Sequence, residues 1–386
     1  MTSAPLGELV DIRGGGTPRR DNPAYWNGNI PWATVKDFKT TEISKTLETI
    51  SEPGVKESAT SVIPAGNIIV PTRMALGKVA INRIDLAINQ DLKALLIHDR
   101  KRVDGEYLFR FLLSKSAYIE GQGKGATVKG ITLDVLRELE VPLPSLAEQK
   151  RIAAILDKAD AIRRKRQQAI QLADEFLRSV FLDMFGDPFT NPKRWPVVRL
   201  DELAEKVTDG THQSPKWTAD GVPFLFISNI VNQQINFETE KFIAEETFRE
   251  LTRITPIELG DVLYTTVGSY GNAALVNSNR KFCFQRHIAH IKPDRNKVIP
   301  EFLWAMMNSP GVRRQADKQA RGVAQKTLNL GELKSFLVFS PSFPEQERFV
   351  KLIRKVGSVK EGFAIGNEAS LQLFRSTSQR AFRGEL

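Results

Sequence analysis

Hydrophobic and polar positions alternate along the chain in two different ways. Short apolar runs broken by glycine, proline and asparagine fill residues 1–146 and again about 192–342, as is typical of short β-strands mixed with a few helices. Residues 147–185 instead carry apolar side chains at steps of three and four, the spacing of one apolar helix face. The pattern therefore predicts two α+β domains with a long helix between them.

The two α+β segments predict the same order of elements. In each of them, three apolar runs predict strands, and a following amphipathic stretch predicts a helix. The expected elements are strands at 68–70, 79–81 and 94–97 with a helix at 106–115 in the first segment, and strands at 262–264, 273–276 and 288–291 with a helix at 301–308 in the second.

The residues themselves also repeat. Leu6-Gly7-Glu8-Leu9, which precedes Gly16-Thr17, recurs as Leu200-Asp201-Glu202-Leu203 before Gly210-Thr211, at an offset of 194 residues. A Pro-Ser-x-x-Glu-Gln-x-Arg motif occurs at 144–151 and at 341–348, where the offset is 197. This period is far longer than the unit of a solenoid, so it indicates a duplicated domain.

The helical segment predicts one strand of a coiled coil. Applying the same offset to its apolar seam gives a second seam, and the expected seam residues are Ile152, Ile155, Ile162, Phe176, Phe349, Leu352 and Val356. Gly357, Gly362 and Gly366 each disfavour a helix by about 1 kcal/mol relative to alanine, so the second helix is expected to be bent or broken there. The alternative is two amphipathic helices that each pack on their own domain.

Composition narrows the choice of partner and compartment. The chain of 386 residues has a formal net charge of +10 and a pI of about 9.6, which favours an acidic partner, with nucleic acid as the leading candidate. No apolar run is long enough to span a bilayer, and the N-terminus lacks the pattern of a secretion signal. The single cysteine, Cys283, excludes an internal disulfide and suggests a small buried side chain, so a cytoplasmic protein is expected.

Candidate catalytic patterns are weak. Pro293-Asp294 with Glu332-Leu333-Lys334 spells a nuclease-like motif, but Asp294-Arg295 repeats Asp99-Arg100 at the end of a predicted strand. Neither the four histidines nor the glycines around Gly123 match a metal site, a Walker loop or a dinucleotide fingerprint. We therefore expect no catalytic residue, no metal site and no cofactor site in this chain.

Basic loops recur in both halves instead. Residues 124–129 align with residues 321–326, and each segment has a cation at both ends, Lys124 with Lys129 and Arg321 with Lys326. A glycine after the first cation lets the backbone approach a phosphate, and the cations would neutralise its charge. These loops are candidate DNA contacts, with ordinary solvated loops as the alternative.

A second set of candidates differs between the halves. Arginines surround the first glycine-rich loop where the second copy has histidine and glutamine, and unlike side chains on one frame suit the recognition of different bases. The candidates are Arg13, Arg19, Arg20 and Gln90 in the first half, and His212, Gln213, Gln285 and Arg286 in the second. Gln90 and Gln285-Arg286 could equally be hydrogen-bonding residues at strand ends. Arg163-Arg164-Lys165-Arg166 in the long helix is either a solvated face or a contact to phosphates or an acidic protein surface.

Taken together, these features resemble the specificity subunit of type I restriction–modification systems. The resemblance covers essentially the whole chain and is most specific at four places: the two Pro-Ser-x-x-Glu-Gln-x-Arg motifs, Met184-Phe185-Gly186-Asp187-Pro188, and Ala381-Phe382-Arg383-Gly384-Glu385-Leu386. It implies two α+β target-recognition domains separated by two long helices that form an antiparallel coiled coil. The domain boundaries are then 1–146 and 186–342, with spacer helices at 147–185 and 343–386.

The resemblance also implies partners and a division of labour. Each recognition domain would bind one half of a split, asymmetric sequence in double-stranded DNA, and the chain itself would be non-catalytic. Modification (methyltransferase) subunits, two of them expected, and restriction (translocase) subunits would bind S-adenosylmethionine, ATP and magnesium. The alternatives are a stand-alone or fused restriction enzyme or methyltransferase, and a coiled-coil scaffold that does not bind DNA.

Overall fold

The chain folds into two compact units that share two long helices. The computed structural model describes residues 2–125, 127–322 and 326–383, apart from the side chains of 364, 365, 367–375, 377–379, 381 and 383. Unit 1 contains residues 1–167 and 365–386, and unit 2 contains residues 168–364. The domain boundaries expected from the sequence remain a prediction, because each compact unit combines one α+β domain with part of both long helices.

Unit 1 is built on two small sheets. The first has the order β2-β10-β7-β8-β4 and the second the order β5-β3-β9-β6, while β1 pairs with β11. The pairs are antiparallel except β4 with β8 and β3 with β9, which are parallel. The strands are β1 (Ser3–Pro5), β2 (Val10–Gly14), β3 (Trp26–Ala33), β4 (Glu42–Ile43), β5 (Glu48–Ile50), β6 (Val62–Ile63), β7 (Ile68–Pro71), β8 (Ala80–Asn82), β9 (Leu86–Ile88), β10 (Leu92–Ile97) and β11 (Glu140–Pro142).

Unit 2 repeats this arrangement. Its main sheet has the order β13-β21-β18-β19, its second sheet the order β17-β14-β20 with β14 parallel to β20, and β12 pairs with β22. A hairpin of β15 and β16 is added. The strands are β12 (Val197–Arg199), β13 (Ala204–Asp209), β14 (Val222–Leu225), β15 (Ile230–Val231), β16 (Gln234–Ile235), β17 (Phe242–Ile243), β18 (Val262–Thr265), β19 (Ala273–Leu275), β20 (Cys283–Phe284), β21 (Ile288–Pro293) and β22 (Leu337–Phe339).

The helices follow the same repeat, so the duplication predicted from the sequence is confirmed, with small differences in the number of strands per sheet. Every strand and helix expected from the apolar runs is present, with ends that differ by at most two residues. The helices are α1 (Leu6–Leu9), α2 (Glu52–Lys56), α3 (Gly105–Ser114), α4 (Ser116–Gly121), α5 (Leu133–Arg137) and α6 (Leu146–Phe185), then α7 (Glu245–Thr252), α8 (Pro300–Met307), α9 (Pro310–Gln319), α10 (Leu330–Lys334) and α11 (Phe343–Arg383). Short 3-10 turns lie at Pro23–Tyr25, Val35–Asp37, Leu200–Glu202 and Ile227–Asn229.

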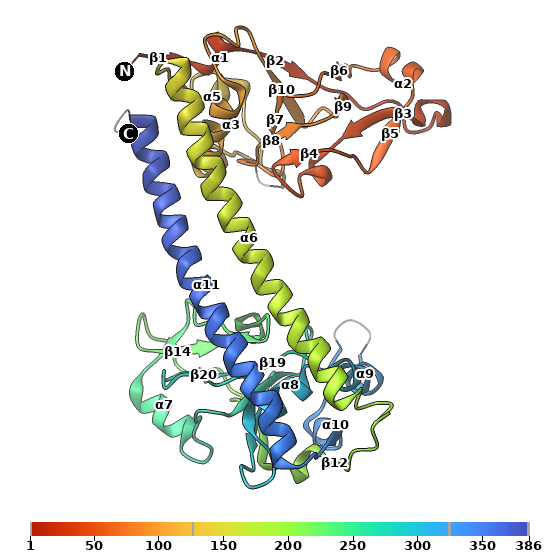
Figure 1. Cartoon of the computed structure of the whole chain (residues 1–386), viewed down its shortest axis with the longest axis vertical. Helices are drawn as coiled ribbons and strands as arrows, with labels where there is room; N and C mark the ends of the chain where they lie inside the picture. The colour runs from red at the N-terminus through yellow and green to blue at the C-terminus, as the bar shows by residue number, and fades with distance from the viewer. Residues whose placement is uncertain (1, 126, 323–325, 384–386) are drawn as a thin grey trace. The chain divides into compact units, whose positions relative to one another are not determined.

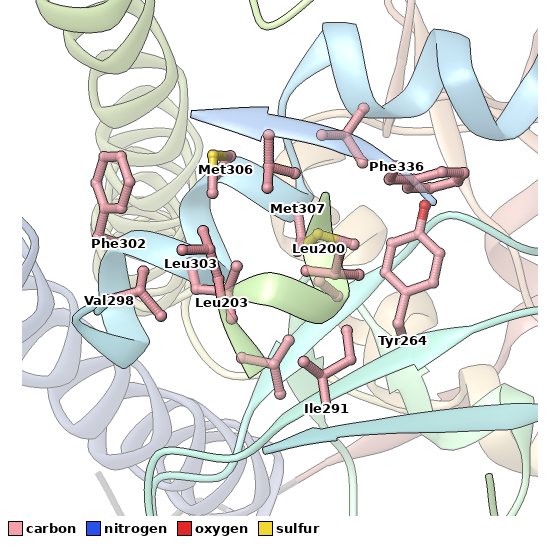
Figure 2. Close-up of a cluster of buried hydrophobic side chains, with 14 of the residues drawn as sticks. Leu200, Leu203, Tyr264, Ile291, Val298, Phe302, Leu303, Met306, Met307 and Phe336 are labelled. Atoms are coloured by element: carbon pink, nitrogen blue, oxygen red, sulfur yellow. The ribbon is translucent and has the colours of Figure 1, made fainter. Parts of the chain in front are cut away.

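Each unit has its own hydrophobic core between its main sheet and its helices. In unit 2, α8 covers β18 and β21, so Phe302, Leu303 and Met306 pack with Tyr264 and Ile291 (Figure 2). The largest core cluster of unit 1 likewise joins α3 to β7 and β10. These cores hold the main sheets rigid, and the loops at the strand ends are therefore carried on a fixed frame.

The two long helices begin with the same pair of capping residues. Ser145 and Ser342 precede α6 and α11, and a glutamate lies three residues after each serine. Ser145 Oγ accepts from the Glu148 backbone N–H (3.3 Å), and Glu345 accepts from the backbone N–H (3.2 Å) and hydroxyl (2.8 Å) of Ser342. These contacts satisfy donors that the first turn of a helix leaves unpaired, which accounts for the Ser-x-x-Glu part of the repeated motif.

The glutamine of the motif connects each helix to its domain. Gln149 and Gln346 are almost completely buried, at 1% and 0% exposure. Gln149 accepts from the Asp104 N–H (2.9 Å) and donates to the carbonyls of Arg102 and Pro144, and Gln346 accepts from the Ile299 N–H (2.8 Å) and donates to the carbonyls of Lys297 and Pro341. We call Gln149 and Gln346 the anchoring glutamines.

Within each unit, α6 and α11 lie side by side and run antiparallel (Figure 1). In unit 2, Phe181 packs on Phe349 with ring centroids 5.5 Å apart, and Asp174 pairs with Lys360 further along both helices. In unit 1, Arg166 donates to the carbonyl of Gly366, and Phe382 packs with the core that includes Ile152. Gly384, Glu385 and Leu386 of the terminal motif lie outside the described residues.

The residues of the predicted helix seam are only partly buried. Ile152 and Phe349 are buried, and Leu352 and Val356 are half-buried, but Ile155, Ile162 and Phe176 are exposed. The reason is that α6 turns its most apolar face toward its own domains, so its contacts with α11 include charged residues such as Asp174. Apolar periodicity therefore identified the helix, and the packing of these three residues against α11 stays a prediction.

The expected break in the second helix is wrong. α11 is continuous from Phe343 to Arg383 through all three glycines. The intrinsic cost of about 1 kcal/mol for each glycine is therefore not enough to interrupt the helix. At Gly366 a Cβ would lie 3.1 Å from the guanidinium carbon of Arg166, so the end of that side chain would have to shift slightly to accept it.

Removing an anchoring glutamine should destabilise its domain. For Gln346→Ala we expect the free energy of unfolding to fall by about 2–3 kcal/mol, because the Ile299 N–H and the Pro341 carbonyl lose their buried partner. Glu347→Ala, at the next and exposed position, is the matched control. Urea denaturation of the full chain followed by tryptophan fluorescence measures both, and equal stability of the two variants would contradict the anchoring role.

Candidate nucleic-acid interface

Four segments of unit 1 meet at one end of its sheets, and we call them loop cluster 1. They are residues 15–25, 72–79, 89–91 and 122–130. The Gly16 N–H donates to the Ile88 carbonyl (3.0 Å), which holds the first segment on the β9–β10 turn. Thr72 bonds through both its N–H (2.8 Å) and its hydroxyl (3.2 Å) to the Asp91 carbonyl, which holds the β7–β8 loop on the same turn.

Unit 2 has the equivalent loop cluster 2, held by the same bonds. It consists of residues 210–221, 266–272, 285–287 and the described parts of 320–329. The Thr211 N–H donates to the Phe284 carbonyl (3.1 Å), and Thr266 bonds through its N–H and its hydroxyl, both at 3.0 Å, to the His287 carbonyl. Both clusters therefore share one backbone frame.

The two basic loops form matching hairpins in these clusters. Lys124 exchanges two backbone hydrogen bonds with Gly130, and Arg321 exchanges two with Thr327, all of 2.7–2.9 Å. The carbonyls of Lys129 and Lys326 accept from the N–H groups of Met74 (3.0 Å) and Gly268 (2.9 Å), and these bonds join the hairpins to the frame. Ala126 and residues 323–325, within the predicted loops, lie outside the described residues.

Glycine is required at one position of each hairpin. Gly125 and Gly322 follow the first cation and have φ angles of +128° and +118°. L-residues rarely adopt this conformation, so the glycine after the first cation is explained by backbone geometry. The Lys124, Lys129 and Lys326 side chains are exposed and make no ion pair within the described residues, while Arg321 is exposed but pairs with Glu332 at 3.3 Å.

A second glycine in each half shows which residues of the two repeats are structurally equivalent. A Cβ on Gly15 would lie 2.0 Å from the Ile88 carbonyl oxygen, and a Cβ on Gly210 would lie 2.1 Å from that of Phe284. Gly15 is therefore the structural equivalent of Gly210, one residue before the Gly16 that the sequence alignment indicated. The offset is 195 at this point, because the indels lie in loops where the residues differ.

The side chains on the shared frame differ between the clusters. In the turn that supports each cluster, Asn89-Gln90-Asp91 of cluster 1 is replaced by Gln285-Arg286-His287 of cluster 2. Gln90 accepts from the Thr17 hydroxyl (2.5 Å), whereas Arg286 is exposed and its Nε lies 3.4 Å from the His287 ring. Burial and the charge of Arg286 lower the pKa of His287, so this imidazole is uncharged at neutral pH.

Arg20 is the most firmly positioned of the arginine candidates. Its guanidinium lies 3.7 Å from the ring centroid of Trp26 and forms two hydrogen bonds with the Glu48 carboxylate. The hydrogen bond from Arg20 lowers the pKa of Glu48, so the pair stays charged over the neutral range. A stacked and bidentately held guanidinium keeps a fixed direction while its remaining N–H groups are available to a ligand.

The other predicted residues lie in or beside the clusters. Arg13 is exposed on β2 and has no ion pair among the described residues. Arg19 pairs with Asp21 (2.9 Å), and His212 bonds to Asp209 (3.0 Å), both at the surface. Gln213 is exposed, and its carbonyl accepts from the Thr211 hydroxyl (3.0 Å). The fold therefore brings together all twelve loop candidates in two groups, with Arg13 at the margin of its group.

Sequence patterns missed Arg73. It follows β7 in loop cluster 1, is 65% exposed at its side chain and lies 4.0 Å from the Asp91 carboxylate. Its equivalent in cluster 2 is Val267, at the offset of 194. A threonine precedes each of these residues, Thr72 before Arg73 and Thr266 before Val267. This repeated threonine is the sequence signal that could have identified the position as part of the shared frame.

The nuclease-like motif is explained by local structure. Asp294 accepts from the Asn296 N–H (3.0 Å) and pairs with Lys297, and Glu332 accepts from the Asn329 N–H (3.0 Å) at the start of α10. Both carboxylates therefore stabilise turns or helix ends. Within residues 2–125, 127–322 and 326–383, no group of three or more His, Cys, Asp or Glu side chains could hold a metal ion.

Two further sequence expectations have structural outcomes. Cys283 is buried on β20, and burial raises the pKa of its thiol to about 12, so it is a core residue as predicted. Among the helices in the described part of the chain, none has the combination of length and apolar content that crossing a membrane requires.

Comparison with known proteins identifies the family. The family model described as type I restriction modification DNA specificity domain matches residues 1–172 and 192–362. The MjaIX specificity subunit of Methanocaldococcus jannaschii is 26% identical over 373 residues, covering 90% of this chain and 84% of that protein. The EcoR124I/EcoR124II specificity subunit of Escherichia coli is 35% identical over 164 residues, covering 41% of this chain and 40% of that protein.

Solved structures show the same fold. The S subunit of a type I restriction–modification system from M. genitalium superimposes with a TM-score of 0.57 at 16% identity, covering 99% of this chain and 96% of that one. A chain from a type I restriction–modification assembly gives a TM-score of 0.56 at 19% identity, covering 100% and 98%. The chain thus belongs to the family of type I restriction–modification specificity subunits, the non-catalytic components that recognise the DNA sequence.

Proposed function

We propose that this chain recognises a bipartite, asymmetric sequence in double-stranded DNA, one half-site with each loop cluster. The observation that carries the proposal is the shared backbone frame with unlike side chains at the turn of each cluster. Amide and guanidinium groups discriminate bases in the major groove, whereas carboxylates accept from cytosine, so different residues on one frame suit different half-sites. The hairpin cations supply phosphate contacts that position the protein but carry no sequence information.

The chain directs partner subunits to that sequence. The partners are two modification subunits that methylate adenine and restriction subunits that cleave unmodified DNA. These partner subunits bind S-adenosylmethionine, ATP and magnesium. The name of the M. jannaschii relative, a specificity subunit of a restriction enzyme, supports this division. The assembly works in the cytoplasm, where the DNA is.

The long helices set the gap between the half-sites. Both α6 and α11 have residues in both compact units, so the same two helices belong to both recognition domains. A rigid connection between two DNA-binding domains requires half-sites at a set helical phase. The gap is therefore a property of helix length and the half-sites are a property of the loop clusters.

Methylation mapping tests the bipartite target. When the chain is co-expressed with its modification subunits, single-molecule sequencing of genomic DNA should show methylated adenines within one split motif of fixed gap. The result follows because each complex binds both half-sites at once. Complexes lacking this chain serve as the control, and random or unsplit methylation by the intact complex would exclude the proposal.

A substitution in one loop cluster should abolish binding at one half-site only. Gly15→Ala should abolish binding at the first half-site and Gly210→Ala at the second, because a methyl group would clash with a carbonyl oxygen of the supporting turn. We expect at least a tenfold loss of affinity for the split duplex, as one half of the base contacts is lost. The measurement is fluorescence anisotropy with the intact complex.

Gly331→Ala is the matched control for both glycine substitutions. A Cβ at Gly331 meets nothing within 4 Å, so this variant should bind like the unmodified chain. A circular dichroism spectrum of each variant checks that the rest of the chain is folded. Unchanged affinity of Gly15→Ala and Gly210→Ala would show that these loops do not contact the half-sites.

Lengthening the helices should change the gap. One heptad added to α6 with a matching heptad in α11 adds about 10 Å of helix, roughly three base pairs of B-DNA. Mapping should then give the same two half-sites with a longer gap. Substituting a heptad without changing its length is the control, and an unchanged gap in the lengthened protein would show that the helices do not set it.

A further inference from the structure

A groove in unit 1 lies beside loop cluster 1 and is lined by cations. It is an open groove of about 730 Å³ between α6 and the loops at 38–41 and 74–79, with α3 and α4 completing its wall. Its charged lining consists of Lys39, Lys78, Arg163 and Arg164 against two carboxylates, Asp160 and Glu120. Met74 lies in its wall and also donates to the Lys129 carbonyl, so the groove is continuous with the basic hairpin of the loop cluster.

Contacts within α6 position the two arginines. Asp160, only 10% exposed at its side chain, pairs with Arg163 at 2.8 Å and with Arg164 at 3.3 Å. The buried Arg110 of α3 approaches the same carboxylate at 3.5 Å and pairs with Asp157 at 2.5 Å. Three guanidinium groups share the one Asp160 carboxylate, so positive charges outnumber negative charges in the groove. The Arg164 side chain remains 52% exposed.

The equivalent groove in unit 2 has more negative than positive side chains in its lining. It measures about 410 Å³ and lies between the long helices and the β15–β16 hairpin. Its charged lining is Lys360 against Asp174 and Glu361. At the offset of 197, Asp160, Arg163 and Arg164 correspond to Gly357, Lys360 and Glu361. Since the frame is shared, the basic lining of the first groove is a property of its side chains and does not follow from the fold.

We propose that the groove of unit 1 binds the sugar-phosphate backbone of the DNA next to the first half-site. The proposal rests on the proposed function and extends it to a surface outside the loop clusters. Guanidinium groups fit phosphate oxygens with two parallel hydrogen bonds, and Lys39 adds an exposed ammonium that has no ion pair among the described residues. DNA held by the Lys124–Lys129 hairpin passes Met74 and continues along this groove, so the first domain holds a longer stretch of DNA than the second.

The salt dependence of binding tests the groove. The double variant Lys39→Gln/Arg164→Gln removes two cations from it, so the slope of log affinity against log salt should become shallower by about 2, since each phosphate contact contributes roughly 0.9. The complex with modification subunits is measured on a duplex that carries the mapped motif and long flanks. The methylated motif itself should stay the same, because phosphate contacts do not specify bases.

Lys150→Gln/Lys158→Gln is the matched control. Both lysines are exposed on α6, neither lines the groove, and neither makes an ion pair within the described residues. This variant should keep the slope of the unmodified chain. Equal slopes for the two double variants would overturn the proposal, even if both bind more weakly than the unmodified chain.

Two other outcomes have distinct meanings. If Lys39→Gln/Arg164→Gln loses the modification subunits by native mass spectrometry while the slope of the assembled fraction stays unchanged, the groove binds an acidic protein surface, and the proposal is wrong. If the unmodified complex shows no preference for a split motif, the proposed function fails first. A preference retained in the unmodified complex, with no slope change in the variant, rejects the groove alone.

Discussion

The arrangement of each recognition domain on its long helix depends on one buried amide. The oxygen of each anchoring glutamine accepts from a backbone N–H at the start of α3 or α8, and its amide nitrogen donates to backbone carbonyls on either side. No other side chain of similar size both accepts and donates in this arrangement. A buried amide left without partners is costly, which fixes the direction in which the helix leaves the domain. The position of the loop clusters relative to their own part of the helix follows from this bond.

Duplication has kept the backbone and changed its chemistry. The bonds from Thr72 and Thr266 to the supporting turns involve backbone groups and a retained hydroxyl, whereas the residues of those turns differ. The same contrast separates the two grooves, where Asp160 and Arg164 of one unit correspond to Gly357 and Glu361 of the other. The two halves therefore share their fold but present different electrostatic surfaces.

The repeat, the strands and the long helices were predictable from the sequence, because apolar spacing and capping residues are local signals. The faces of α6 were not, since Phe176 continues a regular apolar seam and yet is exposed in the fold. α11 continues through Gly357 although glycine disfavours a helix locally. Among the candidate DNA contacts, Arg73 was missed because its neighbour Asp91 is close only in three dimensions. Which base each side chain contacts depends on DNA geometry that no residue spacing encodes.

The hydrogen bonds of the loop-cluster frame have a consequence for how such proteins change. Asn89 is buried, and its amide makes hydrogen bonds with Asp91 within the turn. Gln90 and Arg286 are exposed and the main chain holds these turns, so the side chains of Gln90 and Arg286 contribute little to folding. Substitutions there are nearly neutral for stability, so new DNA preferences can accumulate without compensating mutations elsewhere. The residues that hold the frame and the side chains that it exposes are therefore largely separate sets of positions, so the DNA target can change while the fold stays the same.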